Sequence, residues 1–280
     1  MLETVDGVIL AVRNAEQAIA RFEELFDARY DHDGQSPEWG ARVVGIRVGT
    51  DMIRLVQPTG PGPIQDHIDK WGEGIIGVYF SSKDVAGVVA SMRANGLEPL
   101  TDDTVAYLPA SQMHGLHVIV APYEERERVG LLSFVYEVTH LVDDWKGVSE
   151  LMTKAFGLDG MKFSPISSKN YGYDGTLTLF DPPNKLDRIE AVTPYGDGAM
   201  NRFFQKRGEG PYMFYVECDD TAGLRKRLDN AGARYAAGDD VDTSSVFIHP
   251  SATHGVLIGV SPKDQAWVWS GRPELAKQQR

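Results

Sequence analysis

Hydrophobic and polar positions along the chain follow two periods, one typical of strands and the other of helices. Residues 8–12 read VILAV, a β-branched run that predicts a strand. Asn14 follows as an expected helix N-cap, and apolar residues then recur at helical spacing as far as Phe26. Two more strand-like runs come at 43–48 and 52–56. The order of strand, helix and further strands defines one predicted unit.

The same order recurs three more times along the chain. Further strands are expected at 77–80, 116–120, 134–142, 176–180, 188–192, 212–217 and 256–260. Three further helices are expected to begin at Asp84, Asp144 and Asp220, because aspartate caps helix N-termini well, and to end near glycines. The pattern therefore predicts four units of related topology.

Three phrases of the first half return in the second half, 136 or 140 residues later. The pairs are IRLVQP at 53–58 with IEAVTP at 189–194, WGEG at 71–74 with RGEG at 207–210, and HGL at 114–116 with HGV at 254–256. A period this long, present twice, indicates a duplicated domain, because solenoid repeats are shorter and more numerous. His114 and His254 precede glycines in matching turns, so we expect them to have a structural role there.

The repeat sets the expected domain boundaries. A first module is predicted at 1–122 and a second at 133–262. The linker at 123–132 contains the mixed-sign run EERER, which is typical of a solvated segment. The tail at 263–280 lies outside the repeat and is expected to pack against one module.

Composition narrows the class of protein. The formal net charge of −12 argues against nucleic acid and anionic membrane surfaces as partners. The single cysteine, Cys218, excludes an internal disulfide and favours a reducing compartment. The sequence shows no secretory signal pattern and no apolar run of the roughly 20 residues that a bilayer span needs. We therefore expect a cytoplasmic protein with a small-molecule partner, and the sequence leaves its oligomeric state open, with a homodimer as one option.

Four β-α-β-β-β units in two paired modules resemble the vicinal oxygen chelate superfamily, which includes glyoxalase I, extradiol dioxygenases, methylmalonyl-CoA epimerase and bleomycin-resistance proteins. The phrase HPSATHGVLI at 249–258 is similar to the last-strand motif of that family, and GEG at 208–210 also fits it. The resemblance covers essentially the whole chain. It implies an α+β fold in which each module is a curled sheet that forms a cup, with helices outside.

The resemblance also implies four metal-ligand positions in each cup, at the start of the first strand and the end of the fourth strand of each unit. In the first module they hold Gly7, Arg54, Gly77 and Ile119, and in the second they hold Glu137, Glu190, Met213 and Gly259. The eight positions include no histidine, whereas non-haem iron oxygenases use two histidines and a carboxylate. We therefore expect no metal and no other cofactor. His140 does not supply the missing ligand, because it lies on the opposite strand face from Glu137.

Glu137 and Glu190 remain as the candidate catalytic pair. Two carboxylates facing each other in a semi-enclosed cup raise the pKa of one of them, so that one is protonated and one ionised near neutral pH. That arrangement suits acid–base catalysis without a metal. The alternative is structural, with Glu190 paired to Arg188 two residues away on the same strand face and Glu137 paired with another inward base.

Other inward positions are expected to bind substrate. In the second module they are Thr139 and Tyr215, beside Arg188. In the first module Arg54, Tyr79 and His117 form a set that could hold a carboxylate or an enolate-like oxygen. The competing interpretation of the first cup is a filled, inactive scaffold in which Arg54 neutralises a structural acid.

Three functions fit these residues. The first is a metal-independent lyase, isomerase or hydrolase that acts on a small organic metabolite, such as an intermediate of aromatic catabolism. The second is a non-catalytic small-molecule-binding protein of the bleomycin-resistance type. The third is an extradiol-type ring-cleaving dioxygenase, kept for its matching length and duplicated plan. The sequence names neither the substrate nor the reaction.

Overall fold

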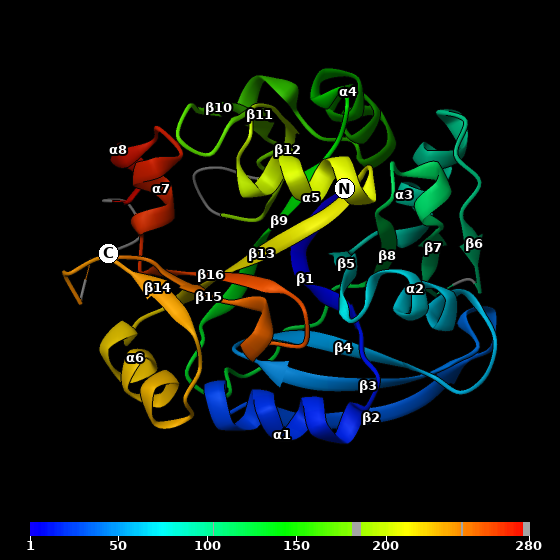
Figure 1. Ribbon diagram of the computed structural model, residues 1–280. Helices are drawn as coiled ribbons and strands as arrows, with labels where there is room; N and C mark the ends of the chain where they lie inside the picture. The colour runs from blue at the N-terminus through cyan, green and yellow to red at the C-terminus, as the bar shows by residue number, and fades with distance from the viewer. Residues whose placement is uncertain (103, 181–185, 242, 277–280) are drawn as a thin grey trace.

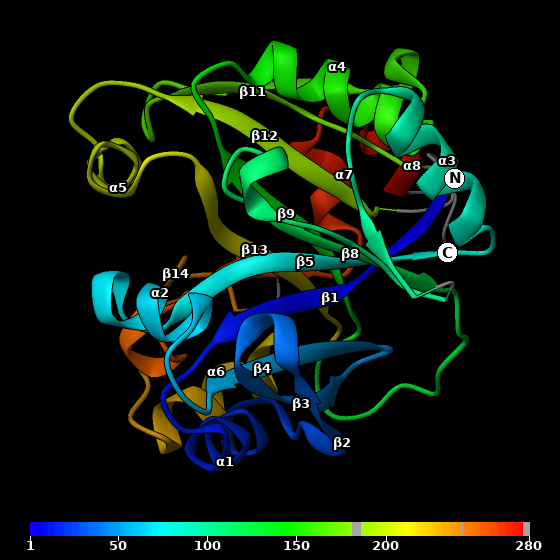
Figure 2. The same cartoon turned by 90° about the vertical axis from the view of Figure 1, so that its right-hand side faces the viewer.

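The computed structural model describes residues 1–102, 104–180, 186–241 and 243–276 of the chain. They form two eight-stranded sheets, one from each half of the sequence. Figures 1 and 2 show the sheets as two curved layers with helices around them. The expected α+β fold of paired modules is therefore confirmed.

The first sheet has the strand order β2-β3-β4-β1-β5-β8-β7-β6. Its strands are β1 (Leu2–Ala11), β2 (Arg29–Ser36), β3 (Ala41–Val48), β4 (Asp51–Pro58), β5 (Gly74–Ser82), β6 (Leu100–Thr101), β7 (Ala106–Leu108) and β8 (His117–Pro122). β1 pairs in parallel with β4, and β5 pairs in parallel with β8, while β1 and β5 join the two units in antiparallel fashion.

The second sheet repeats this plan in the order β10-β11-β12-β9-β13-β16-β15-β14. Its strands are β9 (Phe134–Leu141), β10 (Ser164–Ser168), β11 (Tyr173–Leu177), β12 (Arg188–Pro194), β13 (Gly210–Cys218), β14 (Tyr235–Ala237), β15 (Val246–Ile248) and β16 (Leu257–Pro262). Again the parallel pairs are the first and fourth strands of each unit, β9 with β12 and β13 with β16.

One helix follows the first strand of each unit, two more connect the paired units, and two short helices lie in the C-terminal tail. The helices are α1 (Ala15–Phe26), α2 (Pro63–Trp71), α3 (Val85–Ala94), α4 (Trp145–Phe156), α5 (Ala199–Arg207), α6 (Thr221–Asn230), α7 (Gln265–Trp269) and α8 (Pro273–Ala276). The side chains of Asn14, Asp84, Asp144 and Asp220 accept hydrogen bonds from the first turns of α1, α3, α4 and α6, so the four expected helix starts are confirmed. No helix in the described ranges is long and apolar enough to cross a membrane.

The sequence pattern missed elements that lack an apolar period. β2 reads RYDHDGQS and is almost wholly exposed at the sheet edge, so alternation of apolar and polar residues does not reveal it. The phrase PGP at 61–63 has the composition of a turn, but Pro63 is the first residue of α2, where its missing N–H costs nothing.

The two modules share one hydrophobic core. The largest cluster of buried residues combines the helix-packed faces of both sheets, and it includes Phe22 and Phe80 from the first half with Phe156 and Phe214 from the second. Phe80 packs edge-on against Phe156, with ring centroids 5.7 Å apart. Separate, smaller clusters fill the concave face of each sheet, which we call the first cup and the second cup.

Matched turns join the modules by two reciprocal contacts. His114 Nδ1 lies 2.8 Å from Glu209 Oε2, and His254 Nδ1 lies 3.1 Å from Glu73 Oε2. Both histidines have positive φ, 50° and 52°. A Cβ at the next residue, Gly115, would lie 2.1 Å from the backbone oxygen of Glu209, so only glycine permits this approach. The histidines have a structural role in these turns, and the recurring HG and GEG phrases are each other's contact partners.

Candidate functional site

Strand pairing brings the polar residues expected in the second cup together. Glu137 on β9 is the register partner of Arg188 on β12, and Thr139 is the partner of Glu190. On its other side, Glu137 is paired with Tyr215 of β13. All five residues named from the sequence therefore lie on three adjacent strands at the middle of the sheet.

The first finding at this site is an ion pair between Glu137 and Arg188. The Arg188 Nε donates a hydrogen bond to Glu137 Oε2, and the two side chains are 1% and 5% exposed. Burial raises the pKa of Glu137, while the charge and the hydrogen bond of Arg188 oppose that rise. Arg188 thus neutralises Glu137, whereas the sequence had offered Glu190 as its structural partner.

Glu190 has a different environment. Its carboxyl accepts a hydrogen bond from the Thr139 hydroxyl, and no arginine or lysine forms an ion pair with it among the described residues. Burial, followed by the negative charge of Glu137, raises the pKa of Glu190 to about 8. The two carboxyl groups therefore differ in their partners, since Glu137 is paired with a guanidinium and Glu190 is hydrogen-bonded to a hydroxyl.

Tyrosine side chains line the cup beside this pair. The ring of Tyr215 lies 6.1 Å from that of Tyr136 and 5.9 Å from that of Trp269. A Cβ at Gly259, on the neighbouring strand β16, would lie 2.3 Å from the Tyr215 ring, so the glycine makes room for it. Burial raises the pKa of Tyr215 well above its ordinary value, so its hydroxyl remains a donor at neutral pH.

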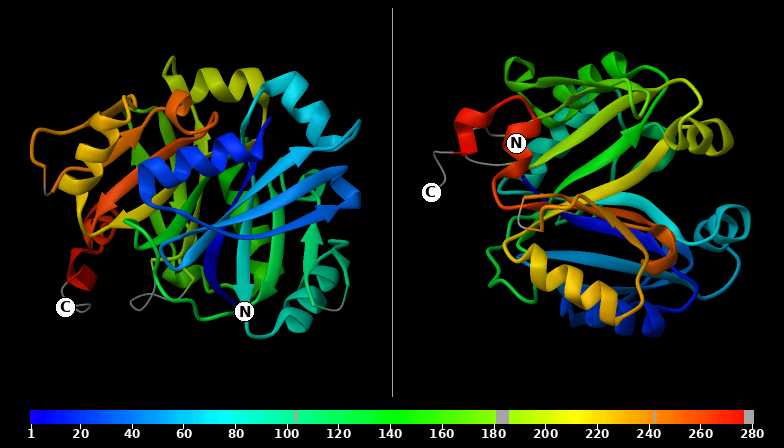
Figure 3. Two further views of the ribbon diagram at one scale, coloured as in Figure 1. Left: turned by 90° about the horizontal axis from the view of Figure 1, so that it is seen from below. Right: turned by 60° about the vertical axis from the view of Figure 1, so that its left-hand side comes forward.

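The C-terminal tail packs on the second cup. Figure 3 shows α7 and α8, in red, beside the second sheet. Trp267 of α7 is fully buried and belongs to the same cluster as Tyr136, Leu177 and Leu275 of α8. The tail lies outside the duplicated pattern and shows little hydrophobic periodicity. The sequence therefore predicted that it packs against one module but not which one.

The residues of the second cup do not fit a resident transition metal. Glu137 is already hydrogen-bonded to the buried guanidinium of Arg188, whose charge would repel a cation. The position of Gly259 offers no ligand, and Tyr215 occupies the space beside it. No group of three or more histidine, cysteine, aspartate or glutamate side chains in the described ranges could hold a metal ion.

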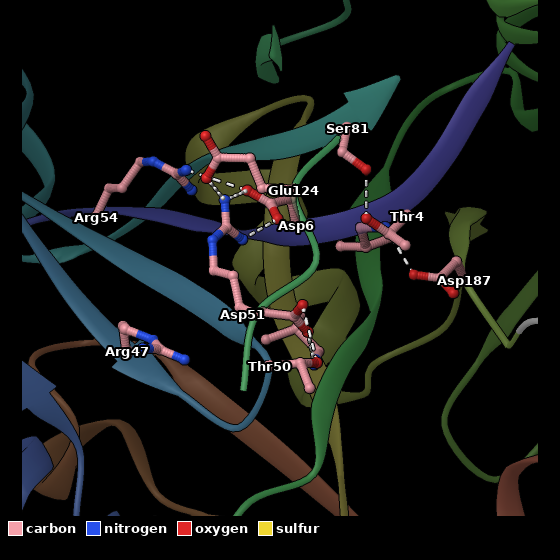
Figure 4. A network of polar contacts seen from close by, with 12 residues as sticks. Thr4, Asp6, Arg47, Thr50, Asp51, Arg54, Ser81, Glu124 and Asp187 are labelled. Atoms are coloured by element: carbon pink, nitrogen blue, oxygen red, sulfur yellow. Dashed lines mark hydrogen bonds and ion pairs between the residues drawn. The ribbon is translucent and has the colours of Figure 1, made fainter. Parts of the chain in front are cut away.

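Arg54 of the first cup belongs to a buried charge network. Its Nη2 lies 3.1 Å from Asp6 Oδ2, and the Arg126 guanidinium binds the same carboxylate. Figure 4 shows Arg54, Asp6 and Glu124 together at the centre of this network. The guanidinium carbon of Arg54 lies 3.2 Å from the centroid of the Tyr79 ring, a cation–π contact. Sequence reasoning missed Asp6 and Arg126, because neither stands at a recurring position of the duplicated modules.

His117, the third residue expected in the first cup, lies behind an aromatic wall. Its Nδ1 accepts a hydrogen bond from the Tyr107 hydroxyl at 2.8 Å, and the two rings stack. Burial lowers the pKa of His117 to about 4, so it is neutral. Arg54 and Tyr79 line a cavity of about 270 Å³ in the cup, whereas His117 lines a separate cavity of about 230 Å³ near α2 and α5.

His140 is fully buried on the helix-packed side, as expected. Its Nε2 donates to the backbone oxygen of His114 in the other module at 2.7 Å. Burial lowers its pKa to about 4. It therefore has a structural contact between the modules and lies apart from the Glu137–Glu190 cluster.

Comparison with solved structures gives matches along the full length of the chain. A mutant of 4-hydroxymandelate synthase from Streptomyces coelicolor superposes with a TM-score of 0.71 at 13% identity, covering 100% of both chains. A fusion protein of a xylose isomerase-like TIM barrel and 4-hydroxyphenylpyruvate dioxygenase matches with a TM-score of 0.63 at 12% identity, covering 100% of this chain and 52% of the other. Neither a protein-family model nor a curated protein gives a significant match.

Proposed function

We propose that this chain, which has the duplicated fold of the vicinal oxygen chelate superfamily, is a metal-independent enzyme that acts on a small organic molecule. Glu190 of the second cup transfers the proton, and the Glu137–Arg188 pair is its fixed, ionised neighbour. The observation that carries the proposal is the contrast between these two buried carboxyl groups, of which one is paired with a guanidinium and the other is bonded only to a hydroxyl.

The proton chemistry follows from that contrast. A carboxyl whose pKa is about 8 holds its proton at neutral pH and can give it to a substrate oxygen or carbon. Arg188 favours the ionised form of Glu137, and the negative charge of Glu137 in turn favours the protonated form of Glu190. Thr139 orients Glu190 by donating its hydroxyl hydrogen. A lyase or isomerase reaction suits this set: Glu190 gives its proton to the substrate carbonyl oxygen, and the resulting carboxylate then takes the proton from the neighbouring carbon, which returns Glu190 to its protonated form.

Arg188 supports recognition of an oxygen-rich substrate. Its Nη1 is buried and finds no hydrogen-bond partner among the described residues, although Nε is bonded to Glu137. A buried donor of this kind has a strong free-energy preference for an acceptor, such as a substrate carboxylate or carbonyl oxygen. Tyr215 and Tyr173 are partly exposed beside the cluster and supply aromatic surface for the carbon skeleton.

Entry to this site requires movement of the tail. Glu137, Arg188 and Glu190 are 4%, 0% and 7% exposed, and α7 packs over the same cup with Trp267 fully buried. α7 is a helix of only five residues at the end of the chain. Displacement of α7 is therefore the step that we propose admits substrate, and its return excludes water from Glu190.

The test is proton exchange with a panel of small organic acids and carbonyl compounds in D₂O, after dialysis of the protein against a chelator. We expect the wild type to change the mass of at least one compound, through deuterium incorporation or bond cleavage. Glu190→Gln should lower that rate by about 10²–10⁴-fold, the range for loss of a general acid–base group. The matched control is Glu217→Gln, which removes another buried carboxyl of the second module whose pKa is raised, to about 7.

Two outcomes would overturn the proposal. If Glu190→Gln retains the wild-type rate, the proton-transfer role is wrong. If no compound changes mass but one binds, and Glu190→Gln alters only its affinity, the protein is a binding module and not an enzyme.

A further inference from the structure

The first cup contains a half-enclosed cavity of about 270 Å³ that the proposed reaction does not use. Its floor is apolar and comes from Ile9, Val43 and Ile119 of three different strands. Trp39 and Tyr107 form an aromatic wall, with ring centroids 5.5 Å apart and planes at 76°. Cavities for drug-sized ligands span about 300–1,000 Å³, so this one has the size for a single ring with small substituents.

The lining of this cavity includes a positive charge, that of Arg54. Arg54 lines it, is 7% exposed, and has an Nη1 that finds no hydrogen-bond partner in the part of the chain that the structure describes. Its position is held by Asp6 through Nη2 and by the face of Tyr79. The donor is therefore rigid, desolvated and unsatisfied, which is costly unless an acceptor reaches it.

Arg54 shares its buried acid partner with a second guanidinium group. Asp6 binds the guanidinium groups of both Arg54 and Arg126, so this one carboxylate faces two positive charges (Figure 4). Glu124, the other partner of Arg126, is 67% exposed and screened by water. Asp51 is buried nearby, and burial raises its pKa well above the ordinary value, which favours its neutral form.

We propose that the first cup is a second binding site, separate from the Glu190 site, and that it takes a small aromatic monocarboxylate. The ligand carboxylate accepts a hydrogen bond from Arg54 Nη1, and its ring lies on Ile9 and Ile119 against Trp39 and Tyr107. A buried guanidinium prefers a carboxylate over a neutral acceptor, because the hydrogen bond is charge-assisted.

Acidic residues at the rim of the cavity restrict which charge the outer end of the ligand can carry. Glu38 and Asp102 line the mouth, and Asp102 is exposed and held by hydrogen bonds from Thr104 and Val105. Both are acids whose position at the mouth disfavours a second carboxylate there. The site therefore selects one carboxylate inside and a neutral or cationic group outside.

The test uses 4-fluorobenzoate as the probe and ¹⁹F NMR titration of the full-length protein, because this signal detects weak binding. We expect 4-fluorobenzoate to bind at least 10-fold more tightly than 4-fluorobenzamide and than 2-fluoroterephthalate. Arg54→Gln should weaken binding of the benzoate by about 10- to 100-fold, as expected for loss of a hydrogen bond between charged groups, with little change for the amide. The matched control is Arg29→Gln, which removes an exposed arginine from the edge strand β2.

A second variant keeps the test decisive if Arg54→Gln does not fold. Val43→Trp fills the cavity from β3, leaves Arg54 in place and does not touch the second cup. We expect it to abolish binding of 4-fluorobenzoate while the far-UV circular dichroism is retained. Unchanged affinity in Val43→Trp, equal affinity for the benzoate and the amide, or no benzoate binding up to 10 mM would each overturn the proposal.

Discussion

Asp51 accepts a hydrogen bond of 2.6 Å from the backbone N–H of Val135, across the boundary between the two modules. The equivalent residue of the second module, Asp187, makes the same contact with the first module, since it accepts a hydrogen bond of 2.7 Å from the backbone N–H of Val5. Asp51 and Asp187 stand 136 residues apart, at matching places in the repeat. Each module thus supplies a buried aspartate to the first strand of the other.

The protonation of Asp51 predicts which substitution is tolerated. Burial, then the charges of Asp187 and Asp6, raises its pKa well above the ordinary value, which favours the neutral carboxyl in the folded protein. Asp51→Asn keeps an oxygen acceptor without a charge and should change the free energy of unfolding by no more than about 0.5 kcal/mol. Asp51→Ala leaves the Val135 N–H unpaired and should cost about 1–3 kcal/mol. Denaturant unfolding measures both, and an equal loss in the two variants contradicts a neutral Asp51.

The stability of the protein should fall as pH rises towards 8, and part of that fall should come from Glu190. Its pKa rises from 4.5 to about 8 on folding, so between these values the folded state holds a proton that the unfolded state releases. Stability then decreases with pH over this window. Glu190→Gln removes this contribution, so its unfolding free energy should vary less between pH 5 and pH 8 than that of the wild type. Parallel profiles for the two proteins would show that Glu190 is ionised in the fold.

Turnover, where a substrate is found, should depend on the same group. A general acid must be protonated, so the rate at saturating substrate should fall as pH rises through about 8. Thr139→Val removes the hydroxyl that orients Glu190, and it should lower the rate and move this limb to higher pH, because the hydrogen bond from Thr139 lowers the pKa of Glu190. If the fall in rate near pH 8 persists in Glu190→Gln, the titrating group is not Glu190.

Because Glu137 and Arg188 form a buried ion pair, removing one member should destabilise the fold more than replacing both. Glu137→Gln leaves a fully buried guanidinium without its carboxylate and should destabilise the fold by about 3–5 kcal/mol. Replacing both members by apolar or neutral groups, as in Glu137→Gln with Arg188→Met, should recover much of that loss because no unpaired charge remains. Thermal and urea unfolding of the wild type, Glu137→Gln and the double variant give these free energies. A double variant that is less stable than Glu137→Gln alone would falsify this account.

The reciprocal histidine–glutamate contacts should contribute little free energy. His114 and Glu209 are 39% and 27% exposed, so water screens their interaction. A double-mutant cycle of His114→Ala and Glu209→Ala should give a coupling energy of about 0.2–1 kcal/mol. Gly115→Ala should cost more than either, since its Cβ would collide with the Glu209 backbone and its φ is 82°. A coupling energy above the cost of Gly115→Ala would make the ion pair the main contact of this turn.

The sequence alone determined the features that depend on neighbouring residues or on the repeat. Asn14 and Asp144 marked helix starts because a side chain caps the N–H of a residue two or three positions later. The repeat established the duplicated plan. Alternation along a strand placed Glu137 and Thr139 on the cup face and His140 on the other, because successive side chains point to opposite faces.

Only the tertiary structure decided which of these groups meet. Strand register is set by packing over the whole sheet, and it places Arg188 beside Glu137 and Glu190 beside Thr139. Arg126 reaches Asp6 across 120 residues of sequence, and α7 folds back on a cup built before it in the chain. Such contacts depend on the packing of distant segments, which local period and composition do not encode. For that reason the unsatisfied guanidinium in the first cup and the buried carboxyl in the second became visible only in the folded chain.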